Sequence, residues 1–229
     1  MRLNRLSRIT LTGLSLWLAS STAISQENFR PYPDDLLSRV RSAAQSLPGD
    51  LPQSIGFAKV AESHRPYSDI IEDGSDEQFI SARAAFQIRY GRSTIMLDSG
   101  MDEEVHRYYG FGRTEPYFAE TNNSLQQALF DAEKIIITHE HGDHVSGVIR
   151  SPYFRQLAPK TIVTEAQIES LVERPQLPQI QLTAEQADQF VVVEYGLIHA
   201  VAPGIVLIKS PGHTAGHQMV YVQLTGNRE

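Results

Sequence analysis

The residues with the clearest potential for chemistry follow the apolar run at positions 135–137, in the order His139-Glu140-His141-Gly142-Asp143-His144. In an extended segment alternate side chains share a face, so His139 and His141 should point the same way. We expect Gly142 to let the backbone turn sharply, which would bring Asp143 and His144 back toward the same point. Imidazole and carboxylate groups bind zinc, iron or manganese. The spacing therefore predicts a metal site where a buried strand ends.

A second histidine cluster follows another apolar run, residues 205–208, and reads Pro211-Gly212-His213-Thr214-Ala215-Gly216-His217. The two clusters together hold five of the chain's eight histidines. One further acidic residue, Asp98, closes the apolar segment 94–97. Each of these polar groups thus follows a segment that reads as a buried strand.

These motifs resemble those of the metallo-β-lactamase-fold hydrolases. The likeness rests on His-x-His-x-Asp-His at 139–144 and on the single histidine of the Pro-Gly-His-Thr turn at 211–214, and Asp98 matches the family's first short motif. It extends from about residue 55 to the end of the chain. The resemblance implies an α/β fold, the αββα metallo-β-lactamase sandwich, with metals at one edge between the two sheets.

The resemblance also implies roles for individual residues. His139, His141 and His213 would hold one metal ion. Asp143 and His144 would bind a second ion. As the expected catalytic residue, Asp143 would in addition orient the nucleophile or receive its proton.

For three other polar residues the sequence leaves two roles open, and for a fourth it excludes one role. Asp98 either supports the metal loop without being a ligand or is a strand-end turn residue. Glu140 cannot be the base of a His-Glu-x-x-His metalloprotease, because position 143 is not histidine and the segment should be strand and turn rather than helix. His217 either joins the metal network or begins the next strand as a half-buried side chain. Thr214 either bonds near the metal or stabilises its turn.

The chemistry expected of such a site is metal-assisted hydrolysis. A metal ion lowers the pKa of a bound water toward about 7, and a second ion roughly 3.5–4 Å away stabilises oxygens that gain charge. We expect one or two zinc ions, with iron or manganese as alternatives. Three imidazoles should bind one zinc tightly, whereas Asp143 and His144 alone should hold a second weakly. The substrate is expected to be a small ester, thioester, lactone, lactam or phosphoester.

Two other interpretations stay open from the sequence. The same fold could hold one iron in a sulfur dioxygenase, with His139, His141 and an aspartate as ligands, although the presence of both Asp143 and His144 disfavours it. Alternatively, the chain is an inactive fragment, because residues 219–227 read as a strand and a turn and the sequence then stops. In that case the resemblance implies that the C-terminal part, with a bridging Asp and a last His, is missing, and low activity and solubility are expected.

The first 25 residues have the organisation of a secretory signal peptide. Arg2, Arg5 and Arg8 form a basic start, residues 9–19 an apolar centre, and residues 23–25 a small-residue cleavage site. The apolar centre is too short for a bilayer-spanning helix, which needs about 20 residues. We therefore expect export to the periplasm or the medium, cleavage near residue 25 and no stable membrane anchor, with an uncleaved anchor as the alternative.

Composition narrows the possible partners. Removal of residues 1–25 deletes three arginines and no acids, so the mature chain would carry 17 basic and 27 acidic residues, a net charge of −10. Such a surface repels nucleic acid, and we expect a small-molecule substrate instead. The chain has no cysteine, which excludes disulfides and thiolate ligands and leaves an all-His/Asp site. The oligomeric state stays open.

With 229 residues and 41% hydrophobic content, the chain suits one sizeable core. We divide it into the signal peptide 1–25, a helical extension 26–54 and the metal-binding domain 55–229. Residues 101–121 are rich in aromatic side chains and form either a flap over the substrate or a locally packed loop. Periodicity predicts helices at 36–47, 124–132 and 165–173, a hairpin of 86–90 with 94–97, and strands near 135–138, 161–164, 190–195, 198–202, 205–209 and 218–224.

Overall fold

The computed structural model describes residues 32–226 together with 228 and 229. The predicted signal peptide, residues 1–25, lies outside the described residues, so its cleavage stays a prediction. Residues Asp35–Glu229 form one compact unit. In the part of the chain that the structure describes, no helix is both long enough and apolar enough to cross a membrane.

The strands form two separate sheets. The larger has six strands in the order β1-β2-β3-β4-β5-β6, and the smaller has three in the order β7-β8-β9. Pairing is antiparallel from β1 to β3, parallel from β3 to β6, and antiparallel throughout the smaller sheet. The strands are β1 (Ser54–Pro66), β2 (Gln78–Arg89), β3 (Thr94–Leu97), β4 (Lys134–Ile136), β5 (Thr161–Thr164), β6 (Val191–Val193), β7 (Ile198–Ala202), β8 (Ile205–Lys209) and β9 (Gln218–Val222).

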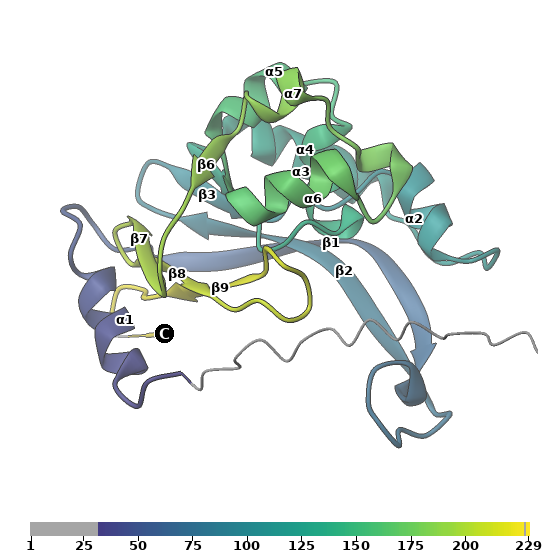
Figure 1. Cartoon of the computed structure of the whole chain (residues 1–229), viewed down its shortest axis with the longest axis horizontal. Helices are drawn as coiled ribbons and strands as arrows, with labels where there is room; N and C mark the ends of the chain where they lie inside the picture. Colours follow the sequence, from purple (N-terminus) through teal and green to yellow (C-terminus); the bar gives the residue numbers. More distant parts are fainter. Residues whose placement is uncertain (1–31, 227) are drawn as a thin grey trace, which may run out of the picture. The chain divides into compact units, whose positions relative to one another are not determined.

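Helices cover the outer faces of the paired sheets. In Figure 1, α2 to α7 lie on one side of the larger sheet and the smaller sheet lies on the other. Val40 and Ala44 of α1 pack against the smaller sheet. The four layers confirm the predicted αββα sandwich. The helices are α1 (Leu36–Ala44), α2 (Glu103–Tyr109), α3 (Ala119–Asp131), α4 (Gly142–Ile149), α5 (Phe154–Leu157), α6 (Glu165–Glu173) and α7 (Ala184–Ala187).

Three apolar clusters lie between these four layers. They form because successive side chains of a strand point to opposite faces of its sheet. Ile135 and Ile137 belong to the cluster under the helices, whereas Ile136 between them belongs to the cluster between the sheets. The side chains of β8 alternate in the same way between the other sheet and α1. Strands buried on both faces carry apolar residues at successive positions. The apolar runs in the sequence are therefore central strands.

Most predicted elements occur where the sequence placed them. Strand 161–164 and helix 165–173 coincide with β5 and α6, and the predicted hairpin is the antiparallel pair β2–β3. β1 was not predicted from the sequence. This strand of 13 residues mixes small, charged and apolar side chains and is half-exposed. Its position at the edge of the larger sheet explains the weak apolar pattern.

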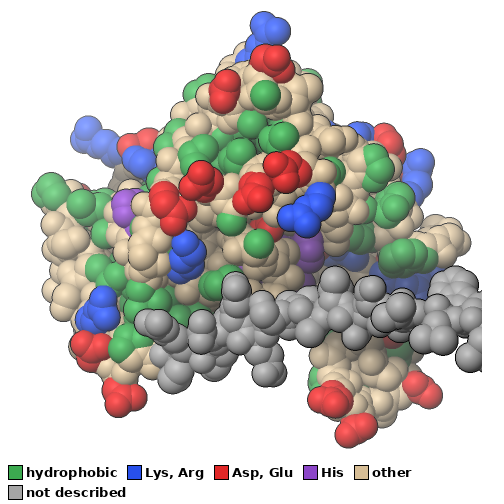
Figure 2. All heavy atoms as spheres, in the orientation of Figure 1, with side chains coloured by type: hydrophobic (Ala, Val, Ile, Leu, Met, Phe, Trp, Pro, Cys, Tyr) green, Lys and Arg blue, Asp and Glu red, His purple; other side chains and the backbone are tan. Residues whose placement is uncertain are grey.

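Figure 2 shows acidic side chains gathered over the helical layer on one face of the molecule. The complete chain has 27 acidic and 20 basic residues.

Candidate metal centre

The sheet topology brings the predicted site residues to one edge. Because β3 and β4 are parallel neighbours, Asp98 and His139, which follow them, meet at the same carboxyl-terminal edge. His213 comes from the loop between β8 and β9 of the smaller sheet. The Gln218 N–H donates to the Thr138 carbonyl at 2.9 Å, and this bond docks the second loop on the first.

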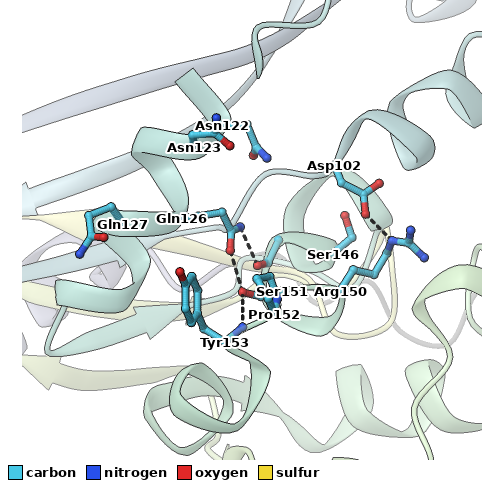
Figure 3. A pocket seen from close by; sticks show the side chains of 11 residues that line it. Asp102, Asn122, Asn123, Gln126, Gln127, Ser146, Arg150, Ser151, Pro152 and Tyr153 are labelled. Carbon is cyan, nitrogen blue, oxygen red and sulfur yellow. Dashed lines mark hydrogen bonds and ion pairs between the residues drawn. The ribbon is translucent and has the colours of Figure 1, made fainter. Parts of the chain in front are cut away.

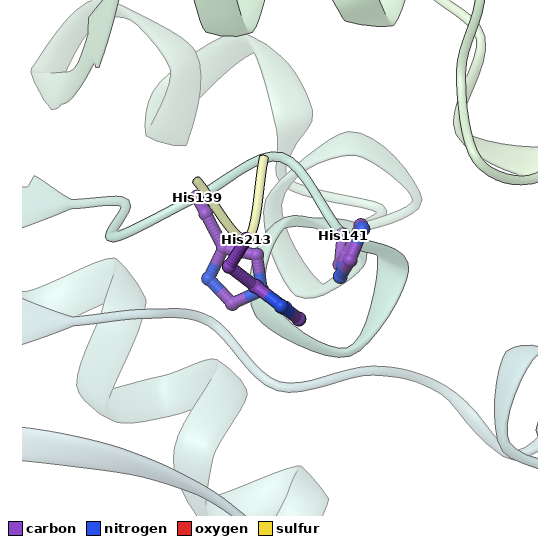
Figure 4. Close-up of side chains that lie close together, drawn as sticks. All are labelled: His139, His141 and His213. Atoms are coloured by element: carbon purple, nitrogen blue, oxygen red, sulfur yellow. The ribbon is translucent and has the colours of Figure 1, made fainter. Parts of the chain in front are cut away.

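Three imidazoles converge at this edge. One ring nitrogen of each of His139, His141 and His213 lies within 4.8 Å of the other two. Figure 4 shows His139 and His141 projecting from one loop and His213 from another. The Nε2 atom of His139 is buried and has no hydrogen-bond partner, a costly state that a bound metal ion would relieve. The three residues therefore fit a zinc ion, for which three imidazoles are a known donor set.

The surroundings keep two of these imidazoles neutral. Burial, followed by the neighbouring imidazoles, lowers the pKa of His139 to about 2. Burial and then His213 lower the pKa of His141, while Asp143 acts in the opposite direction. A metal ion binds the neutral form of imidazole, so these side chains are ready for a metal at neutral pH.

Glu140 joins the two histidine loops. This residue is only 6% exposed, and its carboxylate accepts hydrogen bonds from the Thr214 hydroxyl at 2.8 Å and from the Gly216 N–H at 3.2 Å. A Cβ atom on Gly216 would lie 2.3 Å from Cγ of Gln167, so glycine is required for this approach. Thr214 therefore bonds across to the other loop, beside the histidine cluster.

Two buried glutamines, which the sequence analysis missed, complete the contact between the loops. Gln167 Nε2 donates to the carbonyls of Ile137 at 3.1 Å and Gly216 at 2.9 Å. Gln218 Nε2 donates to the same Ile137 carbonyl at 2.7 Å. The sequence indicates this role only weakly. Gln167 also forms the capping box of α6 with Thr164, a pattern that predicts the start of a helix and not a contact between loops.

Asp98 supports the first histidine loop. Its carboxylate accepts hydrogen bonds from the Thr138 N–H and from His144 Nδ1, each at 2.8 Å. Burial alone would lower the pKa of His144, but the Asp98 carboxylate outweighs it and raises that pKa. Asp98 is 4% exposed, and its φ of 59° is a left-handed conformation that aspartate tolerates. It combines the supporting role and the turn role considered from the sequence.

Asp143 and His144 also lie next to the three imidazoles. The ring centroids of His144 and His139 are 3.8 Å apart, and Asp143 Oδ2 is 3.7 Å from His144 Nε2. Asp143 Oδ2 in addition accepts a hydrogen bond from Arg83 Nη1 at 2.8 Å. Arg83 was not predicted as a site residue. In the sequence, the one feature that sets this residue apart is its position as an arginine between two alanines in a strand that contributes to the core.

The turn predicted at Gly142 is instead the start of a helix. α4 begins at Gly142 with His141 as its N-cap, so Asp143 lies in the first helical turn. A Cβ atom on Gly142 would lie 2.9 Å from Leu177 and 3.0 Å from the Tyr109 hydroxyl. The prediction of strand and turn was therefore wrong here, and close packing is the reason for glycine at this position.

His217 lies at the border of the cluster. Its ring centroid is 5.5 Å from that of His139. Its Nδ1 atom lies 2.8 Å from the Ser210 hydroxyl and 3.0 Å from the Ser210 carbonyl. His217 is half-buried and directly precedes β9, as one of the two interpretations expected.

The aromatic segment 101–121 is packed over much of its length. Val105, His106 and Tyr109 of α2 are buried, whereas Tyr108 and Phe111 are exposed. Tyr109 reaches the site, because the Arg83 guanidinium lies 4.4 Å over its ring. These contacts favour the locally packed loop over an open flap.

A separate polar cleft of about 420 Å³ lies beside α3 and α4. Figure 3 shows that its polar side chains bond to one another. The Ser151 hydroxyl donates to Gln126 Oε1 at 2.7 Å, and the Arg150 guanidinium bonds to Asp102. None of the predicted metal ligands lines this cleft, so it is distinct from the histidine cluster.

The fold and the histidine cluster together define a class of protein. Residues 82–226 match the family model of the metallo-beta-lactamase superfamily, and the chain belongs to this superfamily. The family, the fold class and the class of metal-dependent enzyme predicted from the sequence are therefore confirmed.

Several solved structures share this fold. An N-acyl homoserine lactone hydrolase, solved with the product N-hexanoyl-L-homoserine at its catalytic metal centre, is 18% identical with a TM-score of 0.59, covering 76% of this chain and 72% of that one. A probable metal-dependent hydrolase from Staphylococcus aureus is 15% identical with a TM-score of 0.55, covering 78% and 72%. A dizinc quorum-quenching lactonase is 16% identical with a TM-score of 0.53, covering 77% and 70%. A comparison with curated proteins finds no match.

Proposed function

We propose that this protein is a zinc-dependent hydrolase that opens a small lactone. The observation that carries the proposal is the convergence of His139, His141 and His213, together with the buried Nε2 atom of His139, which has no hydrogen-bond partner. Three imidazoles match a catalytic zinc site, which leaves a position for substrate. An iron oxygenase of the two-histidine, one-carboxylate type needs a carboxylate as the third ligand, so the donor set favours zinc.

The protein and the metal would contribute different parts of the chemistry. A zinc ion at the three histidines supplies Lewis acidity, which polarises a carbonyl and lowers the pKa of bound water. Glu140 holds the two histidine loops together, and Asp98 orients His144. Asp143 is fixed by Arg83 through one carboxylate oxygen, and its other oxygen would orient a water molecule or accept its proton.

Two observations support a lactone as substrate. Fold neighbours described as lactonases hold the product N-hexanoyl-L-homoserine, one of them at its catalytic metal centre. In this chain, a cavity of about 160 Å³ beside Asp143 and His144 is bordered by Phe86 and by alanines 82 and 84. This cavity is smaller than the roughly 300 Å³ at which ligand sites usually begin, so it would hold only part of a substrate. Its apolar wall next to polar groups suits an acyl chain beside a reactive carbonyl.

The test is an assay of zinc-loaded protein with N-hexanoyl homoserine lactone, an acyclic ester, a thioester, a lactam and a phosphodiester. We expect the lactone to react fastest, with loss of activity after chelation and in His139→Ala. His64→Ala is the matched control, because His64 is an exposed histidine of β1. Zinc-loaded protein that hydrolyses none of the five would contradict the proposal, and oxygen consumption by iron-loaded protein would favour the dioxygenase.

We also propose that the protein acts outside the cytoplasm. The support is the order of basic, apolar and small residues in positions 1–25. N-terminal sequencing of the exported protein should give a start near residue 26, and a mature protein that begins at Met1 would contradict cleavage.

A further inference from the structure

Arg83 is a basic residue in β2 whose side chain is held in one place by three contacts. Its Nη1 donates to Asp143 Oδ2 at 2.8 Å, and its Nε donates to the Ser63 hydroxyl at 2.9 Å. Its guanidinium carbon lies 4.4 Å from the centre of the Tyr109 ring. The Arg83 side chain is 12% exposed and that of Asp143 is 20% exposed, so water screens this ion pair only in part.

The contacts behind Arg83 keep it turned toward Asp143. Ser63 Oγ, which accepts from Arg83, also lies 3.1 Å from Glu115 Oε2. Glu115 is itself paired with Arg65. The Nε atom of Arg83 is therefore held by Ser63 of β1. Its Nη1 atom is held by Asp143, in the first turn of α4.

Asp143 and His144 are the residues that the family resemblance assigns to a second metal ion. An arginine side chain does not lose its charge in proteins, so an ion bound to Asp143 would lie beside a permanent cation. The carboxylate that would offset the ion's charge is already neutralised by Arg83. A second ion on the other Asp143 oxygen would lie close to the Arg83 guanidinium and be repelled by it. An ion that displaced the guanidinium would leave a largely buried cation without its partner, which is also unfavourable.

We propose that Arg83 takes the place of a second metal ion, so that the protein holds one ion at His139, His141 and His213. This inference rests on the proposed function for that first ion. Arg83 acts as a positioning residue, because it fixes the Asp143 carboxylate and supplies a positive charge at the edge of the cavity. From the number of ligands alone, the sequence predicts weak binding of a second ion. The structure adds a fixed positive charge as a second cause.

Zinc binding to metal-free protein tests this proposal without an activity assay. Calorimetry gives the number and affinity of the bound ions, and metal analysis checks that number. We expect one ion per chain for the wild type. Arg83→Met should bind a second ion at least about tenfold more tightly than the wild type does, because the competing charge is gone. Arg89→Met is the matched control, because Arg89 is an exposed arginine of the same strand that bonds to Gln87, and it should bind one ion.

Each outcome separates the two proposals. Two tightly bound ions in the wild type would overturn the role of Arg83 and leave the three-histidine site intact. One ion in both the wild type and Arg83→Met would also overturn it, since Arg83 would then not be what excludes the second ion. An absence of zinc binding in every variant would contradict the proposed function together with this inference. If Arg83→Met does not fold, Arg83→Gln removes the charge and keeps a donor for Ser63.

Discussion

The Glu140 carboxylate and the Thr214 hydroxyl form a hydrogen bond of 2.8 Å across a sequence separation of 74 residues. The bond joins the loop of His139 and His141 to the loop of His213. A zinc ion tolerates little variation in ligand distance, about 2.0–2.1 Å to each nitrogen. Two loops that share three ligands must therefore be held at a fixed separation, and this buried bond contributes to that.

Loss of the bond should weaken metal binding. We expect Glu140→Gln and Thr214→Val to lower zinc affinity by about 10–100-fold, the range found when residues that orient metal ligands are changed. Competition with a chromophoric chelator measures the affinity, and Glu169→Gln, an exposed glutamate of α6, is the control. Wild-type affinity in both loop variants would show that other contacts suffice.

The Asp98 carboxylate should stabilise the fold through its charge. Asparagine also tolerates the φ of 59° at this position, so Asp98→Asn changes the charge and keeps the backbone conformation. We expect a loss of about 1.5–3 kcal/mol in the free energy of unfolding, because a charged hydrogen bond to His144 is weakened. Urea denaturation of metal-free protein measures it, with Asp188→Asn as an exposed control. Equal stability of wild type and Asp98→Asn would argue against the supporting role.

Packing of α4 on the loop after β3 should not tolerate a methyl group at Gly147. A Cβ atom there would lie 1.9 Å from the Ser99 carbonyl oxygen. We expect Gly147→Ala to destabilise the protein by about 1–3 kcal/mol or more, because overpacking forces the backbone to shift. Gly196→Ala is the control, since a Cβ on Gly196 meets nothing within 4 Å. Thermal denaturation of both variants decides the question, and equal midpoints would contradict the close approach.

Metal-free protein should lose stability as the pH falls below about 6.5, the usual pKa of histidine in an unfolded chain. His139, with a pKa of about 2, stays neutral in the folded state, so the unfolded state binds more protons on acidification. His144 acts in the opposite direction, because its raised pKa adds stability at low pH that is lost as the pH rises.

The difference between wild type and His139→Phe isolates the His139 contribution. Between pH 7.5 and 5.5, the wild type should lose more unfolding free energy than the variant, by at most about 1.4 kcal/mol per pH unit. Guanidinium denaturation in the presence of a chelator gives these values. Identical pH dependence in the two proteins would contradict a depressed His139 pKa.

The histidine site was predictable because its main residues are local in sequence or follow apolar strands. His139, His141 and Asp98 stand directly after buried strands that are parallel neighbours, and the two motifs carry a clear resemblance. The start of α4 was not predictable from periodicity, because its polar first turn precedes only a short apolar segment.

The groups that hold the site together carry little sequence signal. Arg83 and Asp143 are 60 residues apart, and their contact depends on how β2 passes the start of α4. Gln167 and Gln218 meet one carbonyl from two different elements. Such contacts arise from tertiary packing, so only the structure identifies them.

Metal analysis of dialysed protein tests the three-histidine site most directly. After exposure to zinc and removal of the excess, the wild type and the His64→Ala control should each retain close to one zinc ion per chain. His213→Ala should retain far less, because only two imidazoles of the site remain. Unchanged zinc content in His213→Ala, or a wild type that retains no zinc, would contradict the site described above.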